Sequence, residues 1–206
     1  MFDPGENGMT EGQNIAPRIK IQASARMITE EDRKQRDFNK LTRLMISIHD
    51  FEQSRSAATF LLEEVNDAAK YPLVEMRRFR CLETAMVVAY ARPFSMAKGE
   101  VGPLTWKDTK LSPTPEEKGL HQKLIKHRNT LYGHSDAEFV KMKVWFMQET
   151  SGGRDVGMVF PQFDEHMRFS LAEINAVHEI TLKLIHALVH QCAEQGAQFG
   201  DRFLQI

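Results

Sequence analysis

From Thr29 onward, the apolar residues of the chain follow the period of an α-helix. The apolar positions in the first part of this region are Phe38, Leu41, Leu44, Met45 and Ile48. They recur three, four and seven residues apart, which places them on one helical face. Thr29 before a run of acidic residues favours a helix start, and Pro72 ends the pattern because proline lacks the N–H that a helix needs. The region is predicted to form one long helix, or two that break near residues 49–54.

A second helix is predicted over residues 73–91, and it stops before Pro93. Its apolar stripe consists of Leu73, Met76, Phe79, Leu82, Met86 and Val87. The segment 93–113 that follows has no helical period and is predicted to be a loop of about twenty residues. Loops of that length in compact domains are usually functional or mobile.

The next helix has the clearest start in the chain. Thr114 at the N-cap, Pro115 at the first helical position and Glu117 at the third form a capping box with the preferred first-turn proline. This helix is predicted to run to about Tyr132, and Gly133 is well placed to end it.

Beyond residue 136 the period changes from that of a helix to that of a strand. Side chains alternate through AEFVKMKVWFMQET, SGGRD predicts a turn and VGMVF predicts a second strand, so the segment indicates a β-hairpin. Ser170 and Glu173 then form another capping box, which opens a last amphipathic helix. The apolar face of that helix consists of Leu171, Ile174, Val177, Ile180, Leu184, Ile185, Leu188 and Val189.

The predicted fold is mainly α: a helical bundle of about four to five helices with a β-hairpin inserted before the last one, because helices with one apolar face must pack on each other. Residues 1–28 are predicted to be a flexible N-terminal arm, since their first half is rich in Gly, Asn, Asp and Glu. Within the arm, residues 18–28 alternate weakly and form either a short strand or more arm. Residues 29–206 are predicted to be one helical domain.

Composition narrows the class of protein. The 206 residues are 42% hydrophobic and 27% charged, as in a soluble globular protein, and the net charge of -1 means that any nucleic-acid site must be a local basic patch. The N-terminus lacks the regions of a signal peptide, and no apolar run is long enough to span a membrane. Cys81 and Cys192 have neither disulfide nor zinc spacing and are interpreted as reduced, buried thiols. We therefore expect a cytoplasmic protein with no membrane partner.

The candidate chemistry lies in KHRNTLYGHSD, residues 126–136. Arg128 and His134 stand six residues apart, but this spacing alone is weak because Arg43 and His49 repeat it. The adjoining asparagine, the glycine and the Ser-Asp pair add weight, since the glycine can re-aim the histidine and the serine or aspartate can orient its ring. In an ideal helix the Arg and His side chains point about 120° apart. Either the helix distorts near the glycine, or a second copy of the chain completes the site.

The phrase LIKHRNTLYGHSD, on a helix after a long loop, resembles the signature of the HEPN superfamily (higher eukaryotes and prokaryotes nucleotide-binding domains). The segment YARPF at residues 90–94 resembles the sequence found in one bacterial branch of that superfamily, whose members are linked to phage abortive infection. The resemblance covers about residues 73–136. It implies a helical bundle that dimerises and cuts RNA without a metal ion or cofactor, in a cleft shared by two subunits. One subgroup carries a modified tyrosine two residues after the histidine. Asp136 stands there in this chain, so that route of regulation is in doubt.

The catalytic residues implied by the resemblance are Arg128, Asn129 and His134. His134 would take the 2′-hydroxyl proton or protonate the leaving oxygen. Arg128 would hold the scissile phosphate with its planar fork, and Asn129 would orient a phosphate oxygen or the histidine. The expected products are a 2′,3′-cyclic phosphate and a 5′-hydroxyl end. The RNA-binding residues expected around this centre are His127, Tyr132, Asp136, Lys126 and Arg92.

Each of these features also has a structural interpretation. An arginine and a histidine near a helix C-terminus simply suit the helix dipole. The basic segment 77–80, with Arg92, Lys123 and Lys126, is either an RNA-backbone patch or a solvated helix face. Trp106 either stacks on a base or anchors its loop.

His186 and His190 have the spacing of metal ligands on a helix, but no further ligands accompany them, so they are interpreted as surface or interface residues.

Three functions follow from these interpretations. The first is an endoribonuclease of the toxin or phage-defence type that acts as a homodimer on RNA, with a cognate antitoxin as a further partner. The second is a catalytically inactive HEPN-like module for nucleic-acid or nucleotide binding or for dimerisation. The third is an unrelated helical ligand-binding domain with its site under the 93–113 loop.

Overall fold

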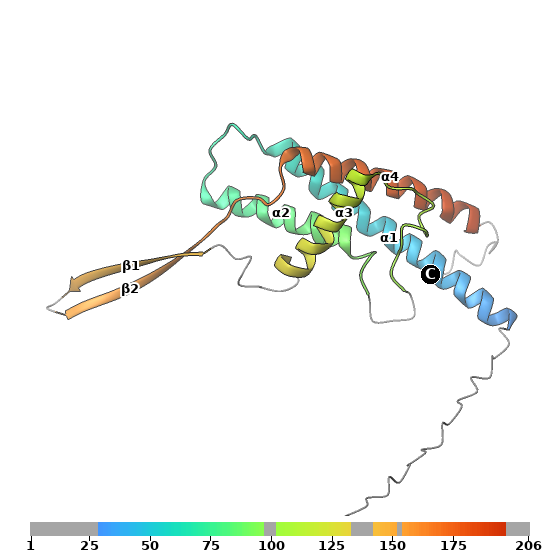
Figure 1. Cartoon of the computed structure of the whole chain (residues 1–206), viewed down its shortest axis with the longest axis horizontal. Helices are drawn as coiled ribbons and strands as arrows, with labels where there is room; N and C mark the ends of the chain where they lie inside the picture. The colour runs from blue at the N-terminus through green and yellow to red at the C-terminus, as the bar shows by residue number, and fades with distance from the viewer. Residues whose placement is uncertain (1–28, 97–101, 133–141, 152–153, 197–206) are drawn as a thin grey trace, which may run out of the picture.

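The computed structural model describes residues 29–96, 102–132, 142–151 and 154–196 (Figure 1). Its elements in chain order are α1 (Glu30–Glu64), α2 (Leu73–Ala91), α3 (Pro115–His127), the π-helical turn η1 (Arg128–Tyr132), β1 (Met142–Ser151), β2 (Arg154–Phe163) and α4 (Leu171–Gly196). This order confirms the mainly helical fold with a hairpin before the last helix. The predicted N-terminal arm, residues 1–28, lies outside the described residues.

The first helix is one unbroken element, which decides between the two predicted alternatives. The hydroxyl of Thr29 accepts a hydrogen bond from the amide of Asp32 at 3.1 Å, and the Asp32 carboxylate accepts one from the amide of Thr29 at 3.0 Å. Where a break was considered, Phe51 is buried and the hydroxyl of Ser54 donates to the carbonyl of Met86 at 2.9 Å. Packing against α2 therefore holds the helix straight through this region.

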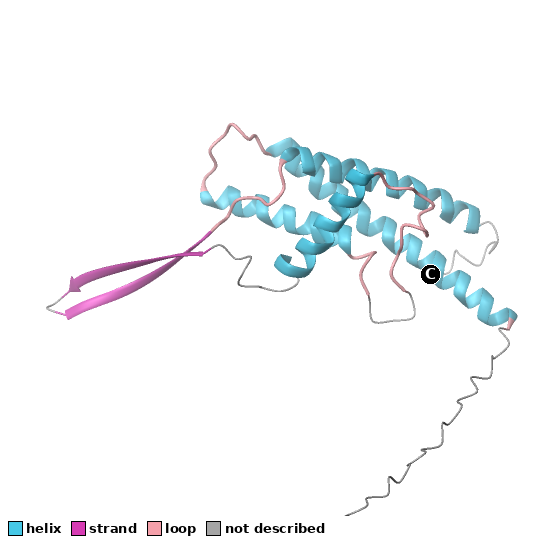
Figure 2. Cartoon of the chain, viewed as in Figure 1, coloured by secondary structure: helices cyan, strands magenta, loops and turns pink. Residues whose placement is uncertain are grey.

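The core of the bundle lies around α1, which packs along both α2 and α4, while α3 crosses the bundle (Figures 1 and 2). The fully buried apolar side chains come from all four helices, and they include Leu44, Phe51, Leu61, Met86, Tyr90, Leu124, Ile174, Leu184 and Leu188. Each such side chain contributes about 1.5–3 kcal/mol relative to an exposed one. None of the described helices is long and apolar enough to cross a lipid bilayer.

The hairpin extends away from the helices (Figure 2). Its strands are antiparallel, with a register that runs from Met142 opposite Phe163 to Ser151 opposite Arg154. β2 is longer than the predicted segment VGMVF and includes Pro161, which is tolerated because β2 is an edge strand. β1 ends at Ser151, one residue beyond the predicted alternation, and residues 137–141 of that prediction lie outside the described residues.

The interpretation of both cysteines as buried thiols is wrong for Cys81, which is exposed. Cys81 lies on the α2 side of a groove between α1 and α2, and that side is open to solvent. Cys192 is half-buried in α4, and burial raises the pKa of its thiol.

Candidate nucleic-acid site at the end of the third helix

The start of α3 follows its sequence signature. The Thr114 hydroxyl accepts from the amide of Glu117 at 3.2 Å, and the Glu117 carboxylate accepts from the amide of Thr114 at 2.8 Å. Lys183 of α4 donates to the same carboxylate at 2.9 Å, and this hydrogen bond holds the Glu117 pKa below its usual value. The capping box therefore fixes α3 on α4 as well as starting the helix.

The last turn of this helix, Arg128–Tyr132, is π-helical. The predicted extent to Tyr132 is confirmed, but the turn is wider than that of a regular α-helix. A π-helical residue advances around the axis by a smaller angle than an α-helical one, so the 120° estimate does not apply across this turn. Turns of this kind are rare and occur frequently at functional sites. The distortion lies on the segment that carries the candidate chemistry.

Arg128 and Asn129 are brought together on this turn. The Arg128 guanidinium donates from Nη1 to Oδ1 of Asn129 at 2.9 Å, and the Asn129 side chain is exposed. This bond occupies the amide oxygen and leaves the Asn129 NH₂ as a donor beside the remaining guanidinium N–H groups. Such a group of donors suits a phosphate oxygen. The predicted residues His134 and Asp136 lie outside the described residues, and of Tyr132 only the backbone is described.

His127 faces the segment before α4. Its ring lies 5.1 Å from the ring of Phe169, centroid to centroid, and its Nδ1 is buried without a hydrogen-bond partner among the described residues. Burial, together with the nearby positive charges of Lys123 and Arg168, lowers the His127 pKa. In a regular α-helix the seven-residue spacing of His127 and His134 would place both on one face, but the π turn that follows His127 interrupts that regularity.

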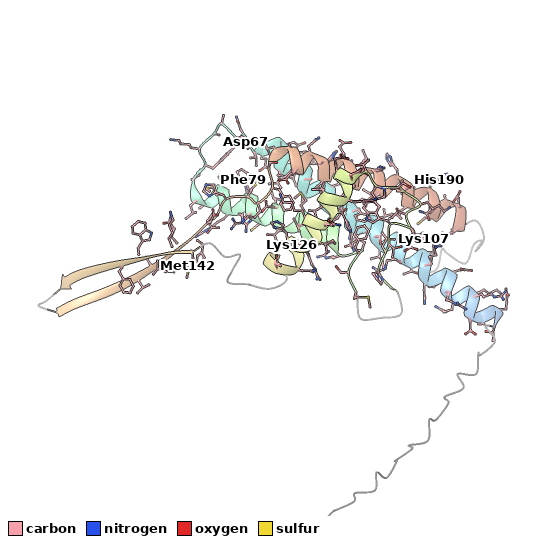
Figure 3. All side chains as sticks on the ribbon, in the orientation of Figure 1. Asp67, Phe79, Lys107, Lys126, Met142 and His190 are labelled. Atoms are coloured by element: carbon pink, nitrogen blue, oxygen red, sulfur yellow. The ribbon has the colours of Figure 1, made fainter. Side chains whose placement is uncertain are left out.

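The other two predicted RNA-binding residues lie on different helices. Lys126 is exposed near the end of α3 (Figure 3), where its carbonyl accepts from the hydroxyl of Thr130 at 2.9 Å. Arg92 caps the end of α2 and donates to Asp50 at 3.3 Å and to Gln53 at 3.1 Å, both on α1. These hydrogen bonds join Arg92 to α1.

The basic patch predicted from the sequence is largely ion-paired. Its pairs are Arg77 with Glu165 at 3.0 Å, Arg78 with Glu75 at 2.9 Å, Arg80 with Glu83 at 2.6 Å, Arg92 with Asp50 at 3.3 Å and Lys123 with Glu173 at 2.5 Å. A phosphate would have to compete with a carboxylate at each of these positions. The structure therefore favours the interpretation of this region as a solvated, ion-paired surface.

A hollow on α1 lies against the 93–113 loop, where the third alternative placed its site, but sequence reasoning did not name its lining residues as a ligand site. A cavity of about 310 Å³ lies between this helix and the segment 102–108. The helix contributes Arg36, Asn39, Lys40 and Arg43 to its lining. Their spacing of three, four and seven residues places these side chains on one face and was the available signal. The lining therefore combines three basic side chains with the carboxylate of Asp108.

The second Arg–His pair is structural. The Nε of Arg43 donates to the carbonyl of Gly102 at 2.7 Å, whereas Nε2 of His49 lies 3.0 Å from Nε2 of Gln53. These two side chains make separate contacts, which agrees with treating the spacing alone as weak.

Trp106 anchors its loop to the bundle. Its ring stacks on Phe94 at 5.8 Å and meets the edge of His121 at 5.4 Å. Nδ1 of His121 lies 3.2 Å from the Tyr90 hydroxyl, and burial lowers the His121 pKa and raises that of Tyr90. Aromatic side chains thus fill the space beneath Trp106, which confirms the anchoring interpretation.

Two histidines of α4 lie beside carboxylates. Nδ1 of His190 lies 3.6 Å from Glu194, and His178 lies 3.4 Å from Glu179. Among the residues that the structure describes, no three His, Cys, Asp or Glu side chains gather where they could hold a metal ion.

Comparison of the chain with protein-family models, with curated proteins and with solved structures finds no match.

Proposed function

We propose that this chain is a metal-independent endoribonuclease of the toxin or phage-defence type, related to the HEPN superfamily and active as a cytoplasmic homodimer. The observation that carries the proposal is the π-helical turn, which presents the hydrogen-bonded pair Arg128 and Asn129 on the surface. The turn coincides with the phrase HRNTLYGHSD, on which the resemblance to that superfamily rests. Turns of this type are rare and are found frequently at functional sites, which supports the proposal.

In the proposed reaction the ribose 2′-oxygen attacks the adjacent phosphorus and the bond to the 5′-oxygen breaks. His134 of one copy takes the 2′-hydroxyl proton, and His134 of the second copy gives a proton to the leaving 5′-oxygen. Arg128 stabilises the negative charge on the pentavalent phosphorus, and the NH₂ of Asn129 donates to a non-bridging oxygen. The products are a 2′,3′-cyclic phosphate and a 5′-hydroxyl. RNA is required because DNA lacks the attacking hydroxyl.

The experiment measures cleavage of a labelled RNA by purified protein in EDTA. We expect the wild type to cut and His134→Ala to be inactive, with 2′,3′-cyclic phosphate ends identified by mass spectrometry. The matched control is His49→Ala, which removes the histidine of the other Arg–His pair and should cut like the wild type. Cleavage that needs added Mg²⁺, or a fully active His134→Ala variant, would overturn the proposal.

A second candidate is an inactive HEPN-like module that binds nucleic acid or a nucleotide, or only dimerises. The ion-paired basic residues of α2 favour it, because they leave little free positive charge for a long RNA strand. Fluorescence anisotropy separates the two: binding of RNA without cleavage supports the module. A cognate antitoxin belongs to the first proposal, since a free ribonuclease would harm the cell that makes it.

A further inference from the structure

The hairpin β1–β2 carries large apolar side chains on a surface open to solvent. Its register gives one face made of Met142, Val144, Phe146, Val159, Pro161 and Phe163. All six are exposed, and Phe146 is the most exposed of them, at 78%. On the other face Trp145 stands opposite Phe160, and its indole donates to Gln162 at 3.0 Å. Apolar side chains at this density on a projecting element mark an interaction surface.

The same hairpin is also the whole of its sheet within the described part of the chain. A two-stranded hairpin is only marginally stable in water, and three or more strands are needed for independent stability. Both of its strands are edges with unpaired backbone groups, which are a ready template for another strand. A further strand would both stabilise the hairpin and pair the free backbone groups of one edge.

The two edges are not equivalent. Strand β2 contains Gly157 and Pro161, and proline removes a donor from any ladder that forms on its outer edge. Strand β1, MKVWFMQETS, contains neither residue type and is rich in residues with high strand propensity. An added strand is therefore best accepted along β1.

The charges on β1 identify the added strand as a second copy of the same chain. Lys143 and Glu149 stand three positions before and three positions after Phe146. If two β1 strands pair antiparallel with Phe146 opposite Phe146, each Lys143 stands opposite Glu149 of the other copy, and opposite charges across a ladder attract. A shift by one residue places Lys143 opposite Thr150 and Glu149 opposite Val144. It also places the apolar faces of the two hairpins on opposite sides of the sheet.

We propose that β1 is a dimerisation strand, which pairs with β1 of a second copy around Phe146 and forms a continuous four-stranded antiparallel sheet. The two apolar faces then lie on the same side of that sheet, with the two Phe146 side chains next to each other at the two-fold axis. The proposed ribonuclease function already requires a homodimer, and this proposal names the strand through which two copies meet. It uses none of the residues assigned to RNA cleavage, so cross-linking at residue 146 tests it whether or not the chain cuts RNA.

Disulfide cross-linking tests the register directly. In a chain with Cys81→Ser and Cys192→Ala, Phe146→Cys should form a covalent dimer on mild oxidation, since opposed residues have Cα atoms about 4.5–5.5 Å apart, within the range a disulfide spans. The matched control is Val159→Cys, which faces residue 146 within its own chain. In the proposed sheet the two copies of residue 159 lie three strand spacings apart, about 14 Å, which is too far for a disulfide.

Charge reversal provides a second, independent measurement. Sedimentation velocity should show that Lys143→Glu and Glu149→Lys each weaken the dimer by roughly fivefold or more, because two symmetric pairs become repulsive. The double variant should restore it. Circular dichroism checks that the helices of each variant remain folded. A wild-type chain that stays monomeric at all concentrations, equal cross-linking at residues 146 and 159, or a double variant as weak as the single ones would overturn the proposal.

Discussion

The carboxylate of Glu83, on α2, accepts a hydrogen bond at 2.9 Å from the backbone amide of Phe169, 86 residues further along the chain. The same oxygen accepts from the amide of Arg168 at 2.5 Å, and Arg80 donates to the other oxygen at 2.6 Å. Glu83 is fully buried. A single acidic side chain thus fixes the segment between the hairpin and α4 onto the bundle, and it places Phe169 against His127 of α3.

Replacing Glu83 should destabilise the whole bundle. Glu83→Gln keeps the shape but removes the charge that holds Arg80 and two backbone amides, so we expect the free energy of unfolding to fall by about 2–3 kcal/mol. Urea denaturation followed by circular dichroism measures this change. The control is Glu75→Gln, which removes an exposed ion pair to Arg78 on the same helix and should cost about 0.5 kcal/mol or less. Equal effects at the two positions would contradict the role assigned to Glu83.

His127 should make the protein less stable as the pH falls. Burial lowers the pKa of this histidine in the folded chain, so the unfolded chain binds the proton more readily. The stabilisation is therefore complete above the unfolded pKa of about 6.5 and is lost as the pH falls through the lower folded value. Urea unfolding at several pH values between about 5 and 7 measures the slope.

The matched variant for this prediction is His127→Phe. Its ring can still pack on Phe169, and it removes the buried Nδ1 that has no partner among the described residues. We expect a smaller loss of stability between pH 7 and 5 than in the wild type, together with unchanged or higher stability at pH 7. His121 remains in this variant and retains its own lowered pKa, so a residual slope is expected. An unchanged slope would show that His127 is as easily protonated in the folded chain as in the unfolded one.

The two tryptophans should differ in their contribution to stability. Trp106 packs on Phe94 and His121 in the bundle, whereas Trp145 is 58% exposed on the hairpin. We expect Trp106→Ala to lower the free energy of unfolding of the helices by about 3 kcal/mol, and Trp145→Ala to change it by about 0.5 kcal/mol or less. Circular dichroism at a helix wavelength follows both. A large effect of Trp145→Ala would mean that the hairpin packs on helices.

Local signals in the sequence were sufficient for most of the helix boundaries. Thr114 and Ser170 each start a helix as their capping boxes predict, Thr29 starts one as a cap before acidic residues, and the bounds of α2 agree with the pattern. These features depend on residues within one or two turns of each other, which a sequence displays directly. The π turn was not predictable, because regular periodicity assumes one helical geometry throughout.

Contacts between distant segments account for the rest of what sequence reasoning missed. The bond from Phe169 to Glu83 joins residues far apart in the chain, and so do the pairs that neutralise Arg77 and Lys123. A run such as MRRFR shows the charges but not their partners, so the sequence left open whether this segment is an RNA-backbone patch or a solvated helix face. The hollow beside Arg43 also involves a contact between distant segments, because Arg43 donates to the carbonyl of Gly102.

Arg128→Lys should separate a catalytic arginine from one that merely suits the end of a helix. Lysine keeps the positive charge and its interaction with the helix dipole, but it lacks the planar fork that donates to Asn129 and to a phosphate at the same time. If Arg128 stabilises the transition state, RNA cleavage should fall by about 10²-fold while the unfolding midpoint stays within experimental error. Arg33→Lys, the same substitution at an exposed position on α1, should leave the cleavage rate unchanged. Should Arg128→Lys cleave like the wild type, the arginine would be a helix-terminal residue only, and the proposed chemistry would lose its phosphate-binding group.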